Sequence, residues 1–149
     1  MTVQIRYLSP RIGKDLPAPR YATSGAAGCD LCACIDQPVT IAPGGLVRVP
    51  TGIAIALPGP ELGAFLFARS GLGVKHGIQL SNGVGVIDSD YRGEIQVGLC
   101  NVGSEPYTIQ PGDRICQMVF LPVCRPEFLQ TEVLDETERG GGGFGSTGK

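Results

Sequence analysis

Short apolar runs separated by glycine and proline constrain the fold of this chain more than any other feature. The runs are rich in Val, Ile and Leu and cover residues 3–7, 46–49, 52–57, 62–67, 84–87, 94–100, 114–121 and 127–133. Several alternate with period two, so that Ile95, Val97 and Leu99 would share one face of a strand. Turn-forming tetrapeptides separate the runs: APGG at 42–45, LPGP at 57–60 and QPGD at 110–113. The pattern predicts many short β-strands.

An all-β fold follows from this pattern, as a sandwich, a jelly roll or a barrel. The 23 glycines and 12 prolines favour turns over long helices. One short helix is expected at residues 70–76, where Ser70 would serve as the N-cap. The 149 residues fit one β domain at 1–135, and a change in composition near Glu136 predicts a flexible, glycine-rich C-terminal arm at 136–149.

The charge content excludes some classes of partner. Charged residues make up 17% of the chain and the net charge is -2, so the basic surface needed for direct nucleic-acid binding is missing. No stretch approaches the ~20 apolar residues of a membrane span, and the first residues do not resemble a signal peptide. We therefore expect a cytoplasmic protein that binds neither nucleic acid nor membranes.

Six cysteines raise the question of a metal or redox site. Cys29, Cys32 and Cys34 form a C-x-x-C-x-C cluster, but a structural zinc site needs four ligands, and His76, the single histidine, lies in a different segment. The other three stand among apolar residues: Cys100, Cys116 and Cys124. We expect buried, reduced thiols that pack as small hydrophobic groups, and the role of the three-cysteine cluster stays open.

Residues 85–93, GVIDSDYRG, form the most concentrated chemical segment. Asp88 and Asp90 follow an apolar run, and an extended backbone would place both carboxylates on one face. Carboxylates placed so closely can provide a base that works near neutral pH. The same residues are also ordinary turn chemistry, and the segment taken alone favours a plain hairpin.

Three further segments place polar groups beside apolar runs. Arg69 and Ser70 precede the expected helix, where they would bind a phosphate or simply form a capped turn. Asp30, in AGCDL at 27–31, is a carboxylate among small and apolar residues, a costly position unless it is paired. Gln117, in GDRICQ at 112–117, would face away from its apolar neighbours. Each segment has a purely structural interpretation as well.

The C-terminal strip, RGGGGFGSTGK at 139–149, fits G-x-x-x-x-G-K and G-x-G-x-x-G in its last seven residues. Both phosphate-binding motifs need a helix immediately afterwards, because its N-terminal amides supply much of the binding. We therefore expect neither motif to be completed by such a helix here. Its composition is typical of a disordered tail, or of a donor-rich segment that closes over a phosphorylated ligand held elsewhere.

Taken in order, these segments resemble the five motifs of the trimeric deoxyuridine triphosphatases (dUTPases) along almost the whole chain. The matching segments are AGCDL at 27–31, RSGLG at 69–73, GVIDSDYRG at 85–93, GDRICQ at 112–117 and RGGGGFGSTG at 139–148. The resemblance implies a β jelly roll or β-clip-like barrel, assembled as a homotrimer whose active sites draw residues from all three chains. It implies hydrolysis of dUTP to dUMP and pyrophosphate, which limits uracil incorporation into DNA and supplies dUMP for thymidylate synthesis.

The resemblance also implies residue roles. Asp88 would be the base that orients water toward the α-phosphorus, with Asp30 and Asp90 tuning charge and ordering water. Tyr91 would lie against the deoxyribose and leave no room for a ribose 2′-hydroxyl. The other substrate-binding residues would be Arg69, Ser70, Gly71, Asn82, Gly85, Val86, Ile87, Gln96, Gln117, Arg139, Phe144, Gly145, Ser146 and Thr147.

Within this implied site, uracil would be read by main-chain groups of a hairpin at 83–86 and by the Asn82 amide. Residues 69–71 would hold phosphates, and Gln117 would lie near the α-phosphate. In the arm, Phe144 would stack on uracil, Arg139 would contact phosphate, and residues 145–147 would cap the γ-phosphate. A Mg²⁺ ion would bridge the triphosphate oxygens and complete its shell with water, without a direct protein ligand.

Two alternatives stand beside this interpretation. A dCTP deaminase, thought to share the fold, needs a carboxylic acid at the pyrimidine edge, and LSNGV at 80–84 has none. A nucleotide sensor or scaffold would keep the pocket without catalysis, but it would have little need of Asp88 and the arm.

Overall fold

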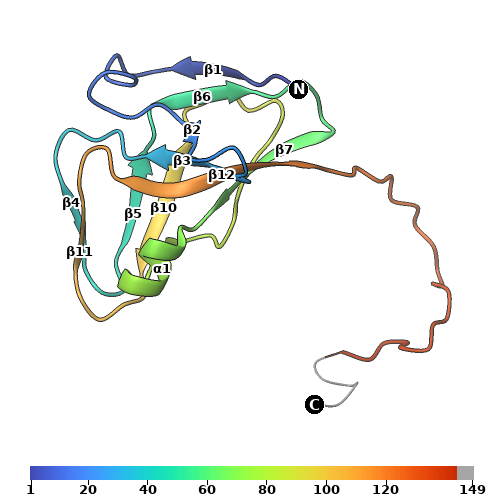
Figure 1. The fold of residues 1–149 in the computed structure, drawn as a ribbon. Helices are drawn as coiled ribbons and strands as arrows, with labels where there is room; N and C mark the ends of the chain where they lie inside the picture. Colours follow the sequence, from blue (N-terminus) through green and yellow to red (C-terminus); the bar gives the residue numbers. More distant parts are fainter. Residues whose placement is uncertain (144–149) are drawn as a thin grey trace.

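The computed structural model describes residues 1–143, which form antiparallel strands and one short helix (Figure 1). The described elements are β1 (Gln4–Tyr7), β2 (Arg20–Tyr21), β3 (Cys29–Cys32), β4 (Val39–Ile41), β5 (Leu46–Pro50), β6 (Ile53–Ala56), β7 (Leu62–Phe67), α1 (Ser70–His76), β8 (Ile78–Leu80), β9 (Gly85–Ile87), β10 (Gln96–Asn101), β11 (Tyr107–Ile109) and β12 (Arg114–Pro122). No helix within this described part of the chain is long and apolar enough to cross a membrane.

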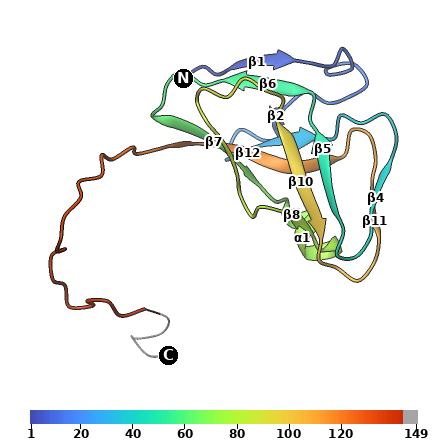
Figure 2. The same cartoon turned by 180° about the vertical axis from the view of Figure 1, so that it is seen from behind.

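The strands form a β jelly roll with two main layers. One layer is a five-stranded sheet in the order β2-β3-β12-β7-β9, which faces the viewer in Figure 1. The other is a three-stranded sheet, β5-β10-β8, which is seen from behind in Figure 2. The pairs β1-β6 and β4-β11 complete the body. The all-β prediction is confirmed.

The core lies between these layers and follows from the alternation in the sequence. Ile95, Val97 and Leu99 are each at most 1% exposed, whereas Gln96 between them is exposed. On β12, Ile115, Cys116 and Met118 turn inward. One strand therefore offers an apolar face to the core and a polar face to the outside, which is where site residues can stand.

Two of the predicted turns form around glycines with left-handed backbone. In APGG, the Gly45 amide donates to the Ala42 carbonyl at 2.8 Å, and Gly44 has φ +74°. In QPGD, the Asp113 amide donates to the Gln110 carbonyl at 3.1 Å, and Gly112 has φ +83°. Proline followed by glycine suits such a turn, because the third position needs a positive φ.

Seven of the eight predicted strands are present, and the one at 127–133 is wrong. After β12 the chain leads away from the body (Figures 1 and 2), and Phe128 and Leu129 are at least 90% exposed. An apolar run becomes a strand only where a neighbouring strand pairs with it, and β12 is already flanked by β3 and β7. Five shorter strands escaped prediction: β2, β3, β4, β8 and β11.

Two smaller expectations also need correction. The helix occupies the predicted residues, but its N-cap is Arg69 instead of Ser70, and no side chain caps it. All six cysteines are free, and Cys29 and Cys116 are buried as expected, but Cys124 is exposed because it lies just beyond the end of β12.

Candidate functional site

Asp88 stands at the edge of a cavity of about 320 Å³. It follows directly after β9, the edge strand of the five-stranded sheet. The cavity is lined by Arg48, Val86, Ile87, Asp88, Tyr91, Glu94, Ile95 and Gln96. Five of these are predicted site residues, so the structure brings together Val86, Ile87, Asp88, Tyr91 and Gln96.

A tight turn follows Asp88 and carries Asp90. The strand ends at Ile87, and the Tyr91 amide donates to the Asp88 carbonyl at 3.2 Å. The backbone from Asp88 to Asp90 is therefore a turn and not extended, so the expectation that an extended backbone puts both carboxylates on one face is wrong. Both nevertheless line a second hollow of about 380 Å³, beside Phe65. Asp88 thus lies at two adjoining hollows, and Asp90 lines only one of them.

The predicted uracil-reading segment joins two sheets and is not a paired hairpin. The strands on either side of it pair elsewhere, β8 with β10 and β9 with β7. A turn between them is closed by the Gly83 amide, which donates to the Leu80 carbonyl at 3.1 Å, and it includes Asn82. Gly85 packs closely on β7, since a Cβ there would lie 3.0 Å from Leu66. The outer edge of β9 is left open to a ligand.

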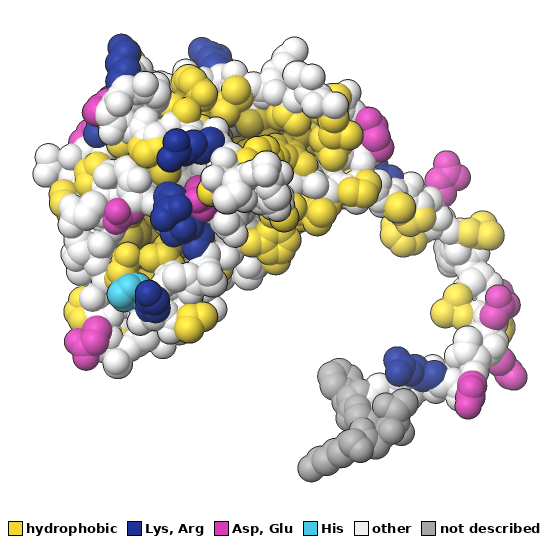
Figure 3. Space-filling model, viewed as in Figure 1, with side chains coloured by type: hydrophobic (Ala, Val, Ile, Leu, Met, Phe, Trp, Pro, Cys, Tyr) yellow, Lys and Arg dark blue, Asp and Glu magenta, His cyan; other side chains and the backbone are white. Residues whose placement is uncertain are grey.

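A second cluster centres on Asp30. Arg69 donates from Nε to Asp30 Oδ1 at 2.9 Å, and Arg114 donates from Nη1 to Oδ2 at 3.1 Å. The Asp30 side chain is 11% exposed and that of Arg69 is 21% exposed. The carboxylate predicted to need a partner therefore has two. Figure 3 shows Lys and Arg side chains gathered near the centre of this face.

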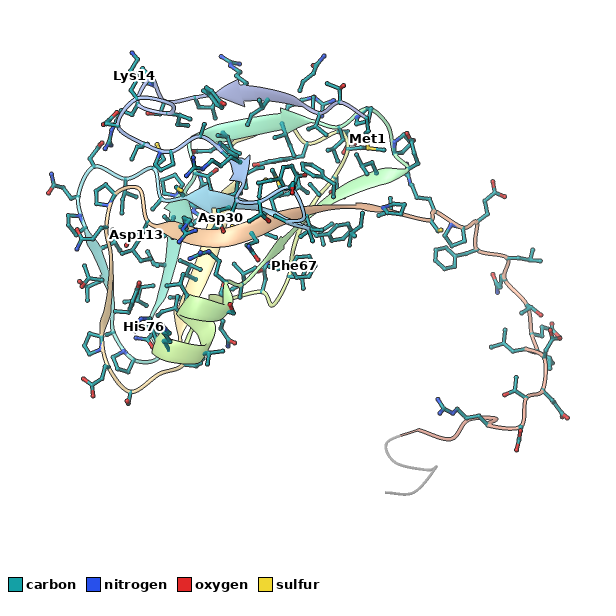
Figure 4. All side chains as sticks on the ribbon, viewed as in Figure 1. Met1, Lys14, Asp30, Phe67, His76 and Asp113 are labelled. Atoms are coloured by element: carbon teal, nitrogen blue, oxygen red, sulfur yellow. The ribbon has the colours of Figure 1, made fainter. Side chains whose placement is uncertain are left out.

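Gln117 belongs to the same cluster because of strand register. It pairs with Asp30 on β3 and with Phe67 on β7, and its side chain is exposed between the buried Cys116 and Met118. Figure 4 shows Asp30 and Phe67 on either side of β12. The outward orientation predicted for Gln117 is confirmed.

The helix that follows β7 adds Ser70 and Gly71 to this cluster. Ser70 and Gly71 are the first two residues of α1. The Arg69 carbonyl accepts the amides of the next two residues, Leu72 and Gly73. Gly71 has open space where a Cβ would be. First-turn amides have no partner within a helix, so this end of α1 offers donors beside Arg69.

The two clusters lie at opposite ends of β7. Ile87, the residue before Asp88, pairs with Ala64, whereas Arg69 comes after Phe67. Ala64 and Phe67 alone are about 10 Å apart along the strand. One chain therefore does not place Asp88 against Arg69.

Of the predicted arm residues, the structure describes Arg139, which is not joined to either cluster. Arg139 is exposed on the segment that leads away from the body in Figure 1. The positions predicted to stack on uracil and cap the γ-phosphate lie outside the described residues: Phe144, Gly145, Ser146 and Thr147.

Three charged side chains of the site were missed by sequence reasoning. Arg48 and Glu94 line the cavity with Asp88, and Arg114 shares Asp30 with Arg69. Arg114 and Glu94 stand within or next to matched motifs, GDRICQ and GVIDSDYRG, so neighbourhood was a usable signal. Arg48 has none, since it comes from β5 and enters the site only because β5 pairs with β10.

Neither the acids nor the thiols form a metal centre within residues 1–143, where no group of three or more His, Cys, Asp or Glu side chains is placed to hold an ion. Burial raises the pKa of the Cys29 thiol, and it raises that of Cys116 to about 12. Cys32 lines a hollow of about 230 Å³ beside Asp30, and its pKa is also raised by burial. Reactive thiolates are disfavoured at all three positions.

Comparison with known proteins finds relatives that are similar over nearly the whole chain. The deoxyuridine 5′-triphosphate nucleotidohydrolase of Desulfitobacterium hafniense (strain DSM 10664 / DCB-2) is 58% identical, over 99% of this chain and 97% of that protein. The enzyme of the same description from Escherichia coli O9:H4 (strain HS) is 52% identical over the same shares.

A solved structure matches the fold over nearly the whole chain. The dUTPase of Staphylococcus bacteriophage 80alpha, solved with dUpNHpp, superposes with a TM-score of 0.85 at 26% identity, covering 99% of each chain. The family model described as dUTPase matches residues 14–148. The chain belongs to the dUTPase family.

Proposed function

We propose that this chain hydrolyses dUTP to dUMP and pyrophosphate, with Asp88 as the base that activates the attacking water. The observation that carries the proposal is the position of Asp88, at the edge of a cavity that also contains Tyr91 and Gln96. A carboxylate beside a space of this size is well placed to hold a water next to a bound nucleotide.

In the chemical step, Asp88 takes a proton from the water as its oxygen attacks the α-phosphorus. The bond from the α-phosphorus to the oxygen shared with the β-phosphate breaks, and pyrophosphate leaves with that oxygen. The negative charge that develops on the phosphate oxygens has to be stabilised, which is the role of Arg69 and of the first-turn amides of α1.

Base and sugar are recognised by different parts of the segment that ends in Asp88. The open edge of β9 presents main-chain donors and acceptors from Gly85 to Ile87, suited to the polar edge of uracil, with Asn82 beside them. Tyr91 lines the cavity and would exclude a ribose 2′-hydroxyl by its bulk. Steric exclusion separates dUTP from UTP better than a pocket that merely tolerates the extra hydroxyl.

The separation of the two clusters supports a homotrimer with shared active sites. Asp88 and Arg69 lie at opposite ends of β7, and the stretch from Ala64 to Phe67 alone separates them by about 10 Å. A neighbouring chain would bring its Arg69, Ser70, Gly71 and Gln117 to the cavity that holds Asp88. The arm of a third chain, residues 136–149, would then close over the nucleotide and exclude bulk water.

A Mg²⁺ ion would arrive with the substrate. Magnesium prefers oxygen ligands and keeps several waters. The triphosphate of dUTP supplies such oxygens. When bound, the ion would neutralise part of the phosphate charge.

Release of pyrophosphate from dUTP in the presence of Mg²⁺ tests the proposed reaction. We expect hydrolysis of dUTP and not of dCTP, and no ammonia from dCTP. Binding of dUTP without pyrophosphate above background would support a nucleotide sensor, and ammonia from dCTP would support a deaminase.

Mixing two inactive variants tests the shared site. Chains carrying Asp88→Asn and chains carrying Arg69→Ala should each be nearly inactive, but refolding them together should restore roughly a quarter of wild-type activity if sites form between randomly mixed chains. Activity no higher than the sum of the separate variants would place the whole site within one chain.

A further inference from the structure

We propose that Glu94 is a positioning residue: it holds Tyr91 in place and so sets the discrimination between dUTP and UTP. This inference rests on the proposed function, because it takes Tyr91 to be the side chain that contacts the sugar. Glu94 lines the same cavity as Asp88 and is half-buried.

The phenol ring of Tyr91 is fixed by one main-chain peptide. Its hydroxyl donates to the Glu94 carbonyl at 2.9 Å. The ring lies over Gly93, where a Cβ would come within 2.6 Å of the Tyr91 Cζ atom. Because Tyr91 is 44% exposed, packing alone does not hold it, and its position depends on where the Glu94 peptide lies.

The Glu94 carboxylate ties that peptide to a second segment. Its Oε1 atom accepts the Gly52 amide at 2.8 Å, and its Oε2 atom accepts Nε2 of Gln96 at 3.2 Å. The Glu94 side chain therefore links its own peptide to Gly52, just before β6, and to Gln96, which lines the cavity. Hydrogen bonds to an ionised acceptor are stronger than those between neutral groups.

Gly52 is a rigid anchor for this link. Its φ is +71°, and a Cβ would lie 2.7 Å from Cys34 Sγ and 2.9 Å from Ile12 Cδ1. The Gly52 carbonyl also accepts the Leu8 amide at 2.7 Å. Gly52 has close neighbours on one side and two hydrogen bonds on its backbone. It therefore holds the Glu94 carboxylate at a fixed place relative to the core.

This anchoring matters because dUTP and UTP differ by a single hydroxyl. A ring that shifts by a fraction of an ångström would make room for the 2′-oxygen. The effect on specificity would therefore appear in the ratio of kcat/KM for dUTP to that for UTP, more than in the rate of either reaction alone.

The test measures this ratio in five proteins: wild type, Glu94→Ala, Glu94→Gln, Tyr91→Phe and Tyr91→Ala. We expect Glu94→Ala to lower the ratio by about tenfold, mainly through a lower KM for UTP, while kcat for the two substrates changes in parallel. Glu94→Gln should keep most of the wild-type ratio, because the glutamine amide oxygen still accepts the Gly52 amide. Tyr91→Phe, which lacks the hydroxyl and leaves Gly52 bound, should lower the ratio as Glu94→Ala does.

The outcomes separate this inference from the function on which it rests. If Tyr91→Ala leaves the ratio unchanged, Tyr91 does not read the sugar and that part of the proposed function fails. If Tyr91→Ala lowers the ratio but Glu94→Ala does not, the positioning role of the Glu94 side chain is overturned, whatever the result for Tyr91→Phe. Should Glu94→Ala fail to fold, Glu94→Leu takes its place, because leucine fills a similar space and accepts no hydrogen bond from the Gly52 amide.

Discussion

Arg69 donates its Nε hydrogen to Oδ1 of Asp30 at 2.9 Å, and both side chains are mostly shielded from water, with exposed fractions of 21% and 11%. A second ion pair has the same length and a different setting: Arg11 reaches Asp36 at 2.9 Å, but Asp36 is 91% exposed. The pair of buried groups positions a side chain that we assign to phosphate binding. The exposed pair provides a matched control, because ion pairs lose strength in water.

Asp30→Asn should therefore both destabilise the protein and weaken substrate binding. We expect a loss of about 1–3 kcal/mol in the free energy of unfolding, because two guanidinium groups lose a charged acceptor. KM for dUTP should rise more than kcat falls, since Arg69 would be displaced from its position. Urea unfolding and steady-state kinetics measure the two effects.

The control for this change is Asp36→Asn, which should alter stability by less than about 1 kcal/mol and leave KM for dUTP as it is. Equal effects of the two substitutions would mean that burial of the Asp30 pair carries no special weight.

Asp88→Asn should lower kcat by roughly a hundredfold or more while dUTP still binds, because the amide keeps the shape of the carboxylate but accepts no proton. Pyrophosphate release gives kcat, and titration of dUTP under non-turnover conditions gives affinity. Asp90→Asn is the matched control. Asp90 lines only the hollow beside Phe65, so its loss should cost much less. Near-full turnover of Asp88→Asn would remove Asp88 from the role of base.

The sequence predicted the strands that have strong apolar alternation and failed where strands are short or polar. β7 was predicted to the residue, whereas β3 was not, because it holds Asp30 between two cysteines. Periodicity reports which residues can form a strand and not which strands are available as partners. Residues 127–133 show this limit, since an apolar run alone did not make them a strand.

In the candidate site, too, contacts between residues close in sequence were predicted, and contacts that depend on strand pairing were not. Asp88, Tyr91 and Gln96 share a cavity as the motifs indicated, because they are close in sequence around one turn. The distance between Asp88 and Arg69 had no signal in the sequence, since it depends on the pairing of β7 with β9. Glu94 escaped notice for a similar reason: its partner Gly52 is 42 residues away.

Deleting residues 139–149 should abolish most hydrolysis and leave the folded body unchanged. Beyond Val123, whose amide donates to the Glu61 carbonyl, the described hydrogen bonds of the tail up to residue 143 are local, such as the one from Thr131 to Val133. The melting temperature should therefore change by less than about 2 °C. Calorimetry and pyrophosphate release measure the two properties, and light scattering shows whether the assembly is kept. A large drop in melting temperature would make the tail a structural element.

Stability should fall in alkaline solution because of the buried thiol of Cys116. Burial raises its pKa from 9.0 to about 12, so the folded protein holds this proton more tightly than the unfolded chain does. The contribution is complete below pH 9 and is lost as pH rises toward 12, with a slope of at most about 1.4 kcal/mol per pH unit. Urea unfolding between pH 7 and 10.5 measures it. Cys116→Ala should make the free energy of unfolding fall less steeply with pH. Part of the fall should remain, because burial also raises the pKa values of Cys29 and Cys32. Cys124→Ala, which removes an exposed thiol, should leave the pH profile as in wild type. Parallel pH profiles for wild type and Cys116→Ala would show that this thiol does not couple folding to pH.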